Sequence, residues 1–508
     1  MDVLAQIFVQ NYGSDIRDEE RPVLDDIFRL VECHTYTVEL LAKQMEASFL
    51  TAGEMLHLLQ EGRMHEGMSE TVTGRAHQRT AFAHIQALFN TSNLSDQEKK
   101  LMMYLSLAGT GGIPAPRFKE WAQLSSFEAV NQLIRKSWLR KESGQQLSMH
   151  PMVRSVVHHV LKPTAENCRE YLHQMLLYCY RAWFRSYSEN LTVADTVQST
   201  LEYFTELQGA DYLYFSCFAN FLWQVGRFDA AIFHMHRVYD ACVRDFGVNA
   251  MATGFVAKAL GGCYFNSRRE QESIRWYKQG LESMQRSGEE ESEDLGMSYE
   301  KVARCYTWKY EQDFAKAEEL FMISLGIRQR LVEKVSQGII PPRQETYEPY
   351  NLNLAYDRVA EVHMEIGRMY QAMGNYEKGS QYALQFVELV QKYRPDNLSG
   401  AAYGYYDCGV CQYHMGIALQ EAGNAAAGEE QLLLAADNLK KALDTNMKMR
   451  GALAVDTIDN QEYLADVYTA LGRYGEASNH YMAVLSMVES LLRKDHPRIS
   501  RVKEKMAF

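Results

Sequence analysis

The sequence lacks the residue pattern that phosphate chemistry most often uses. A phosphate-binding loop needs Gly-x-x-x-x-Gly-Lys-Ser/Thr, because backbone N–H groups and one lysine must meet the phosphates together. The dipeptide Gly-Lys does not occur in the chain, and the stretch GTGG at 109–112 has no lysine. The acidic stretch VLDD at 23–26 falls in a segment of helical periodicity, not at a strand end. We therefore expect the chain by itself neither to bind ATP tightly nor to hydrolyse it.

Metal and nucleophile chemistry are no better supported. Cys408 and Cys411 have half the spacing of a zinc site, and only His414 follows at a plausible distance. They stand in a helical repeat segment, where cysteine is more often a small buried hydrophobe. No Ser/His/Asp or Cys/His arrangement typical of a nucleophilic catalytic site is evident in the sequence. We predict that the chain is not an enzyme, with no catalytic residue, no metal and no cofactor of its own.

Composition and charge narrow the classes of partner that the chain could bind. The chain has 508 residues, a formal charge of -12 and 46% hydrophobic residues, so it is a folded protein that repels phosphate backbones. No apolar run reaches the ~20 residues that span a bilayer, and no basic region precedes the first apolar residues. Nine scattered cysteines suit a reducing compartment. We predict a cytoplasmic protein with neither a membrane nor nucleic acid as its partner.

The elements that position any site are internal repeats. Aligned segments share a large apolar residue, a small one, a ring or aliphatic residue three positions later, and a turn. The third apolar position falls at Leu222, Tyr264, Tyr306, Tyr370, Leu419 and Tyr468. A fixed period of this length indicates stacked helical hairpins.

The residue types explain how each hairpin closes. Small residues let two helices approach closely while rings fill the gaps between them. Glycines in the turns supply the left-handed conformation that ends the first helix. The small residues are Gly261, Ala303, Gly367, Gly416 and Ala465, faced by Ala231, Ala317 and Ala477, and the turn glycines are Gly226, Gly374, Gly423 and Gly472.

The pattern resembles the tetratricopeptide repeat, with its best match at 464–478 and coverage of about 210–495. An ordinary helical bundle is the alternative. We expect about six hairpins in 210–508, an insert at 331–350, and a solvated loop at 289–294 (EEESED). The resemblance implies a groove that binds an extended peptide or another helix.

The repeat register places a set of polar and aromatic residues in that groove. They are Asn220, Lys258, Asn266, Arg304, Trp308, Arg368 and Gln371, with Glu462 and Asp466 nearer the end. The middle of the groove is mildly basic, which favours an acidic or C-terminal carboxylate ligand. For any one of these residues, a solvated position on a helix face is an equal alternative.

The front of the chain carries no repeat. Apolar stripes predict a helical domain at 1–62, with Thr51 capping its last helix, followed by a seam at 63–90. At 91–165, a capping box of Ser95 and Glu98 opens the first of three helices, and a strand-turn-strand around Gly144 ends the domain. This order predicts a winged helix, and 166–209 are connecting helices. The fold class is thus all-α: helical bundle, winged helix and tetratricopeptide-like α-solenoid.

A winged helix also invites a DNA-binding interpretation, because its third helix can lie in the major groove. That helix offers only Arg135 and Lys136, while Trp138 and Leu139 look like core residues. A peptide-responsive transcription regulator is therefore the alternative hypothesis.

Residues 1–165 also resemble the helical and winged-helix domains of bacterial NB-ARC and related STAND ATPases. The resemblance rests on HTYTVELLAKQ, on LSDQEKKLMMYLSLAGTGGIPAPRF and on LSMHPMVRSVV. It implies that His150 of Met149-His150-Pro151 occupies the position of the family's nucleotide-sensing histidine. Proline replaces the usual aspartate there, and Cys33 and Thr35 stand at the family's glycine and proline positions. The alternative for His150 is a histidine that merely precedes a helix.

The leading hypothesis is a sensor or scaffold in STAND-type signalling. The repeats bind a protein or peptide, and the front domains relay occupancy to a nucleotide-binding ATPase module. ADP or ATP would bind only where that separate domain completes the site. We expect the ATPase half to be encoded separately or lost by truncation.

Overall fold

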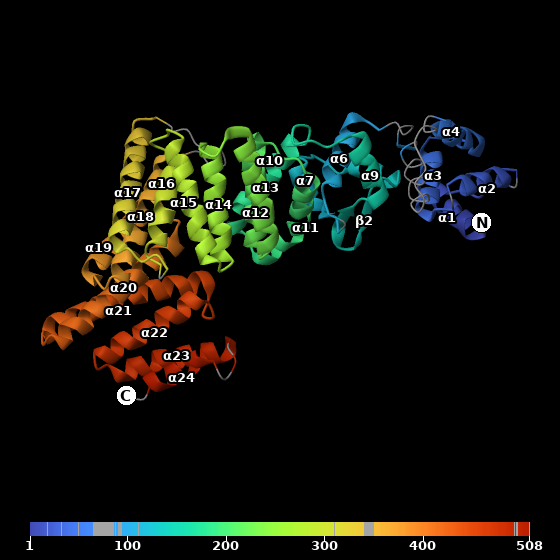
Figure 1. Cartoon of the computed structure of the whole chain (residues 1–508). Helices are drawn as coiled ribbons and strands as arrows, with labels where there is room; N and C mark the ends of the chain where they lie inside the picture. The colour runs from blue at the N-terminus through green and yellow to red at the C-terminus, as the bar shows by residue number, and fades with distance from the viewer. Residues whose placement is uncertain are drawn as a thin grey trace. The chain divides into compact units, whose positions relative to one another are not determined.

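The computed structural model describes the chain except residues 18, 32, 49, 65–85, 87, 90–93, 110, 309, 340–349, 492, 494–495 and 507–508. It is almost wholly helical and divides into two compact units, residues 1–245 and 246–508 (Figure 1). Most of the predicted seam at 63–90 lies outside the described residues. Among the described residues, no helix combines the length and apolar character that a bilayer crossing needs.

The first unit begins with the four helices that the apolar stripes predicted. Phe8, Ile27 and Phe28 are buried at their centre. Thr51 caps the fourth helix, because its hydroxyl accepts a hydrogen bond from the backbone N–H of Glu54. The helices are α1 (Asp2–Tyr12), α2 (Arg21–Leu30), α3 (Thr35–Ser48) and α4 (Ala52–Met64).

Three further helices and three short strands follow. Ser95 and Glu98 form the predicted capping box at the start of α6, and Trp138 and Leu139 are buried as expected. The sheet order is β1-β3-β2, antiparallel throughout, and sequence reasoning missed β1. The elements are α6 (Asp96–Ser106), β1 (Ile113–Pro114), α7 (Ala115–Trp121), α8 (Glu128–Arg135), β2 (Arg140–Glu142), a 3-10 turn η1 (Ser143–Gln145) and β3 (Gln146–Ser148).

The close pairing of β1 with β3 explains a glycine in the Gly-rich stretch. Gly112 has φ +74, and a β-carbon there would lie 2.2 Å from the carbonyl oxygen of Leu147. Only glycine fits this approach. Gly112 therefore lies in a turn directly before β1, with its N–H bonded to the carbonyl of Gly109.

Longer helices complete the first unit around an aromatic core. Trp121, Tyr171 and Tyr178 are buried, with ring centroids 5.8 Å and 5.4 Å from Trp121 to the two tyrosines. The elements are α9 (Pro151–Val160), α10 (Arg169–Tyr180), η2 (Arg181–Phe184), α11 (Tyr187–Tyr203), η3 (Gly209–Asp211), α12 (Tyr212–Gln224) and α13 (Phe228–Phe246).

The second unit is an α-solenoid of helical hairpins. Five hairpins pack in sequence, and a short helix packs against the last of them. The pair α12 and α13, which carries the first of the aligned segments in the sequence, lies in the first unit. The helices are α14 (Met251–Asn266), α15 (Glu270–Arg286), α16 (Glu293–Cys305), α17 (Phe314–Ser336), α18 (Leu352–Ala372), α19 (Tyr376–Tyr393), α20 (Leu398–Glu421), α21 (Ala425–Arg450), α22 (Val455–Ala470), α23 (Tyr474–Leu491) and α24 (Pro497–Lys505).

The turns and helix contacts are those the residue types indicated. Gly226, Gly374, Gly423 and Gly472 all have positive φ, between 71° and 83°, where the first helix of each pair ends. The pair α14/α15 lacks this glycine, and Arg268 takes the same conformation with φ 63°. The small residues Ala303, Ala465 and Ala477 are fully buried.

Two predictions for the second unit need correction. Residues 331–336 belong to α17, so the predicted insert at 331–350 starts later than expected, and 340–349 lie outside the described residues. The acidic run 289–294 is not a solvated loop. Glu293 and Asp294 form the first turn of α16 and are each only 8% exposed, because buried cations pair with them.

Candidate ligand-binding surface of the repeats

The first helices of successive hairpins are joined by ion pairs between residues distant in sequence. Lys258 on α14 donates from Nζ to Asp294 Oδ1 on α16 at 2.7 Å. Both side chains are only 10% exposed, and the ammonium also lies 4.8 Å from the ring centroid of Phe255. Lys258 therefore fastens two helices and has little surface left for a ligand.

The same connection recurs twice along the array. Arg304 Nε on α16 lies 3.4 Å from Glu365 Oε2 on α18, and Arg368 Nε on α18 donates to Asp407 Oδ2 on α20 at 2.9 Å. The arginine side chains are 28% and 39% exposed, and their carboxylate partners 13% and 12%. We call these three pairs the ion-pair ladder. Its carboxylates lie deeper than its two guanidinium groups.

Electrostatics keep the ladder arginines charged. Burial works against the charge on Arg368, but Asp407 and Glu365 outweigh it and raise the pKa of the guanidinium. For Arg304, burial is likewise outweighed by Glu365 and Glu300, so its pKa is raised. Burial raises the pKa of Asp407, against the lowering effect of Arg368. Both arginines remain cations under all ordinary conditions.

An aromatic pair lies beside the middle ion pair of the ladder. Phe265 on α14 and Trp308, just beyond α16, stack with centroids 5.0 Å apart and planes 14° apart. The guanidinium carbon of Arg304 lies 5.7 Å from the Phe265 centroid. Rings beside a cation offer apolar contact and cation–π attraction to a ligand.

The structure brings some predicted groove residues together and leaves others apart. Lys258, Arg304, Trp308 and Arg368 join or adjoin the ladder. Asn266 is exposed at the end of α14, where its amide bonds back to Gly262, and Gln371 is half-buried near the end of α18. Asn220 is on α12, in the first unit.

Sequence reasoning missed the carboxylate side of this surface. The sequence predicted a mildly basic groove. It did not predict that Asp294, Glu365 and Asp407 would pair with the basic residues of that groove. These residues fall one hairpin further along the chain. The only signal available was their helical register in the following repeat.

A second set of missed residues is a buried ionic cluster under α16, α17 and α18. Arg328 is completely buried and donates from Nη1 to the carbonyl of Arg358 at 2.6 Å. Its Nη2 lies 2.9 Å from Glu300 Oε2 and 3.4 Å from Glu293 Oε1. Tyr350 donates its hydroxyl to Glu293 at 3.1 Å. This cluster holds the hairpins together and offers no open surface.

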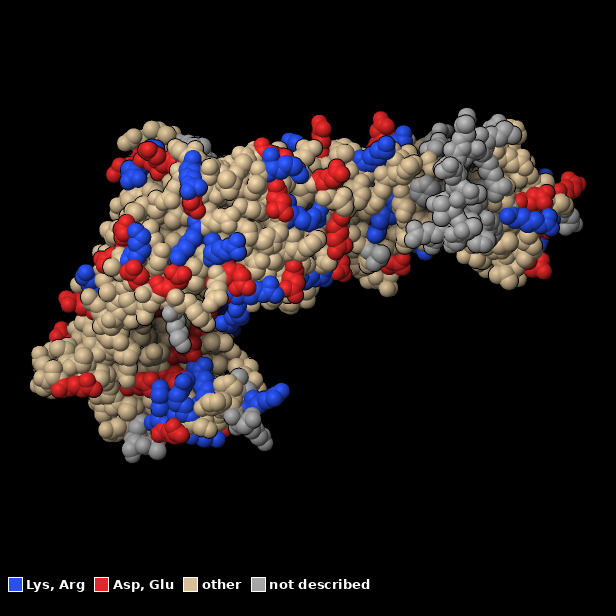
Figure 2. All heavy atoms as spheres, viewed as in Figure 1, with Lys and Arg blue, Asp and Glu red and all other residues tan. Residues whose placement is uncertain are grey.

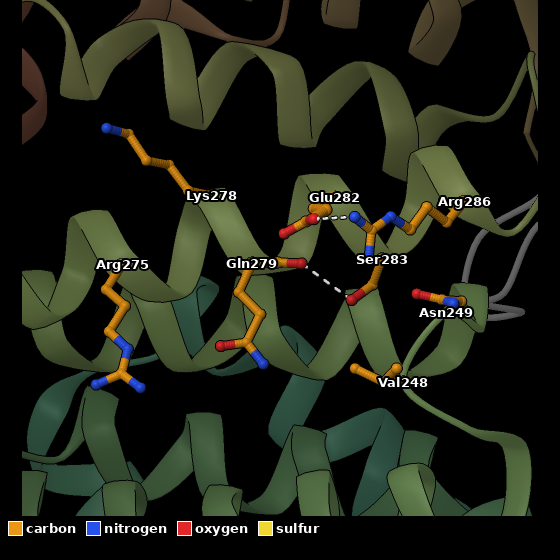
Figure 3. A pocket seen from close by; sticks show the side chains of 8 residues that line it. All are labelled: Val248, Asn249, Arg275, Lys278, Gln279, Glu282, Ser283 and Arg286. Atoms are coloured by element: carbon orange, nitrogen blue, oxygen red, sulfur yellow. Dashed lines mark hydrogen bonds and ion pairs between the residues drawn. The ribbon is translucent and has the colours of Figure 1, made fainter.

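A shallow pocket lies against the second helix of the first hairpin in this unit. It has a volume of about 360 Å³ and is lined by one face of α15 together with Val248 and Asn249. Figure 3 shows that Arg286 faces Glu282, with which it forms an ion pair, while Arg275 points elsewhere. Lys278 is held by Glu311 at 2.9 Å. A pocket of about 650 Å³ in the first unit is lined by Arg237 and Arg244, whose guanidinium groups bond to loop carbonyls.

His150 lies inside the first unit against the helical domain. Its ring stacks on Tyr36, with centroids 3.9 Å apart, and its Nδ1 accepts from the backbone N–H of Met152 at the start of α9. Burial, with the charges of Arg140 and His34, lowers the pKa of His150 to about 4. The ring is therefore neutral at pH 7. Tyr36 covers one of its faces.

The two cysteines with zinc-like spacing are core residues. Cys408 and Cys411 are buried on α20, and burial raises the pKa of both thiols, to about 12 for Cys411. Cys408 Sγ lies 3.3 Å from the hydroxyl of Ser380. Over the part of the chain that the structure describes, no group of three or more His, Cys, Asp or Glu is placed to hold a metal ion.

Fold and surface together define a repeat protein of the tetratricopeptide-like α-solenoid class. No protein-family model matches the sequence. No curated protein matches it.

Solved structures with similar folds share little sequence with the chain. A signal transduction ATPase with numerous domains (STAND) with a tetratricopeptide repeat sensor, from Pyrococcus horikoshii, is 14% identical over 99% of this chain and 68% of its own, with a TM-score of 0.45. A Rap protein complexed with Competence and Sporulation Factor is 13% identical over 90% and 98%, with a TM-score of 0.39. The quorum sensor NprR from B. thuringiensis is 12% identical over 74% and 98%, with a TM-score of 0.36. At this identity the likeness concerns the fold and not the ligand.

Proposed function

We propose that the chain is a binding protein whose α-solenoid holds a peptide or protein segment and that it catalyses no reaction itself. The observation that carries the proposal is the ion-pair ladder. It links α14, α16, α18 and α20, one after another, in a row of three ion pairs. An extended ligand lying along this row would meet one hairpin after another.

The ladder arginines have donors left for a ligand. Arg304 and Arg368 each meet their carboxylate through Nε. Among the residues that the structure describes, their terminal nitrogens donate no hydrogen bond to another side chain or carbonyl. A guanidinium has five N–H donors, and its terminal pair matches the two oxygens of a carboxylate. The ligand class that fits is therefore a segment with acidic side chains or a C-terminal carboxylate.

The neighbouring rings set a second requirement. Phe265 and Trp308 are half-buried and stack beside Arg304. A ligand with an apolar or aromatic residue near its carboxylate would contact both groups. Such anchors usually carry most of the binding free energy.

For the front domains we infer a relay role in STAND-type signalling. His150 and Tyr36 lie between the helical domain and residues 91–165, where a change in either domain would reach the other. A nucleotide would require a separate binding module, because this sequence has no phosphate-binding loop. The element order of residues 91–165 supports the assignment of a winged helix.

The alternative, a transcription regulator that binds DNA, gains little support from α8. Lys136 is turned to the buried Glu98, with Nζ and Oε1 2.9 Å apart, and leaves Arg135 as the exposed cation of that helix end. Glu128 on the same helix would face phosphate with the wrong sign.

The test is selection of peptides from a phage-displayed library of random dodecamers on the full chain. We expect enriched peptides to be acidic, and their affinity to fall at least tenfold for the variant Arg304→Gln/Arg368→Gln. Arg286→Gln, which removes a paired arginine from α15, is the matched control and should bind as the wild type does. Selection that enriches no acidic peptide, or that does not distinguish the two variants, would rule out the ladder as the ligand surface.

A further inference from the structure

The short helix α24 contacts both helices of the final hairpin. α24 packs beside α23 at the C-terminal end of the array (Figure 1). Ile499 and Val502 are buried, in one apolar cluster with Leu464, Val467 and other residues of α22 and α23. Residues 492–496 join it to α23. The short helix therefore covers part of α22 and α23.

The charged residues of these two helices are in matching register. α22 carries carboxylates at Asp459, Glu462 and Asp466, and α24 carries cations three and four residues apart in the same way, at Arg498, Arg501 and Lys505. This spacing places each set on one face of its helix. We call Asp459, Glu462 and Asp466 the acidic stripe.

Every member of the stripe is bound. Arg498 Nη2 lies 2.6 Å from Asp459 Oδ1 and 2.8 Å from Glu462 Oε2. Arg501 Nη2 lies 3.3 Å from Glu462 Oε1, and Lys505 Nζ lies 3.2 Å from Glu462 Oε1 and 2.7 Å from Asp466 Oδ2. Figure 2 shows lysine and arginine side chains beside aspartate and glutamate over the C-terminal helices.

This contact differs from those between earlier first helices. In the ion-pair ladder, each connection is a single pair between helices of 13 to 24 residues. In contrast, α24 has only 9 residues and contacts the stripe through three cations. Isolated helices shorter than about 12–15 residues are marginal in water. Besides the burial of Ile499 and Val502, α24 is therefore held in place by charge complementarity with the stripe.

The charge of the acidic stripe and the rings beside it favour a positively charged partner. Burial would raise the pKa of Glu462, but Lys505 and Arg498 outweigh it, so its pKa is lowered and the carboxylate is fixed as an anion. The rings of Tyr406 and Tyr413 lie 5.6 Å and 6.2 Å from that of Tyr463, on the same part of α22. Aromatic faces beside carboxylates favour lysine and arginine.

From this geometry we propose that the acidic stripe is a docking site for a basic amphipathic helix of a partner protein, and that α24 is an intramolecular occupant which the partner displaces. The proposal deepens the binding function above, on which it rests, by naming the partner chemistry at the C-terminal end. A segment tethered by five residues acts at an effective concentration of the order of millimolar. The partner helix must therefore bind more tightly than α24 does.

The first experiment is hydrogen–deuterium exchange of the wild-type chain. We expect the amides of α24 to exchange at least tenfold faster than those of α22 and α23, because an occupant detaches without unfolding its site. Exchange of all three helices at one rate would overturn the proposal, since α24 would then be an integral cap.

The second experiment supplies the helix in trans. A fluorescent peptide of residues 496–506 is titrated into the full chain carrying Arg498→Glu/Arg501→Glu/Lys505→Glu, in which α24 is repelled from the stripe. We expect binding at least tenfold tighter than to the wild type, and its loss when Asp459→Asn/Glu462→Gln/Asp466→Asn is added. A peptide with the same three cations changed to glutamate is the matched control.

The outcomes are distinct. No binding to the charge-reversed chain, or binding that the neutralised stripe leaves unchanged, overturns the proposal. A wild-type dimer that the neutralised stripe abolishes also overturns it, because a second copy's α24 would be the occupant. The acidic peptides selected on the ladder are titrated into the same variants. Their binding is expected to depend on Arg304 and Arg368 and not on the acidic stripe. A negative result at one site therefore leaves the proposal for the other site unaffected.

Discussion

Gly261 on α14 lies directly against the ring of Tyr277 on α15. A β-carbon at Gly261 would come within 2.5 Å of Tyr277 Cδ1, whereas one at the adjacent Gly262 would meet only the Tyr277 hydroxyl, at 3.7 Å. Two neighbouring glycines of one helix thus have different roles. Gly261 allows the two helices to touch, whereas Gly262 lies away from that contact.

The two glycines should respond oppositely to alanine. Gly261→Ala should lower the free energy of unfolding by about 1–3 kcal/mol, because the ring must move out of a packed core. Gly262→Ala should raise it by about 0.5–1 kcal/mol, the helix preference of alanine over glycine. Urea unfolding followed by circular dichroism measures both. Equal effects of the two substitutions would contradict the contact.

Arg268 should be a strained position. It occupies the left-handed conformation, with φ 63°, that glycine takes in the other turns. Arg268→Gly should raise the free energy of unfolding by about 0.5–1 kcal/mol, because the steric penalty exceeds the entropy that glycine loses. Gly374→Ala, at the equivalent turn with φ 76°, should lower it by about 1 kcal/mol. Thermal melting of both variants checks the sign.

The buried ionic cluster should tolerate no loss of its central cation. Arg328→Met leaves Glu293 and Glu300 buried without their shared partner, and should lower the free energy of unfolding by about 3–5 kcal/mol. Arg330→Met breaks an ion pair with Glu291 at the surface of the same helix and should lower it by less than about 1 kcal/mol. Denaturant unfolding of this pair separates the buried contact from the exposed one. Similar losses would contradict the burial of the cluster.

Acid should weaken the same cluster. Burial works to raise the pKa of Glu300, but Lys301 and Arg328 outweigh it and hold the pKa at about 2, below the ordinary value of 4.5. A lowered pKa contributes stability that is present above the unfolded value and is lost as the pH falls towards the folded value. Stability should therefore fall between about pH 5 and pH 2. Glu300→Gln should show a shallower fall over this range in unfolding curves, and an unchanged slope would refute the assignment.

Much of the fold follows from local pattern. The spacing of large and small apolar residues predicted the helical hairpins, because a helix buries one stripe and a close helix pair needs small residues at its contact. Glycines such as Gly374 marked the turns, since the left-handed conformation favours glycine. The capping box of Ser95 and Glu98 fixed where α6 begins. All three signals act within a few residues of the chain.

Partner choice was decided by tertiary structure. Sequence register placed Lys258, Arg304 and Arg368 on one surface, but not which carboxylate each would meet. Those partners lie 36, 61 and 39 residues further on, and the distance varies because hairpins differ in helix and turn length. The acidic run 289–294 looked solvated for the same reason, since Arg328 is far from it in sequence. Local periodicity assigns a residue to a face of its helix, and only the stacking of hairpins determines what that face meets.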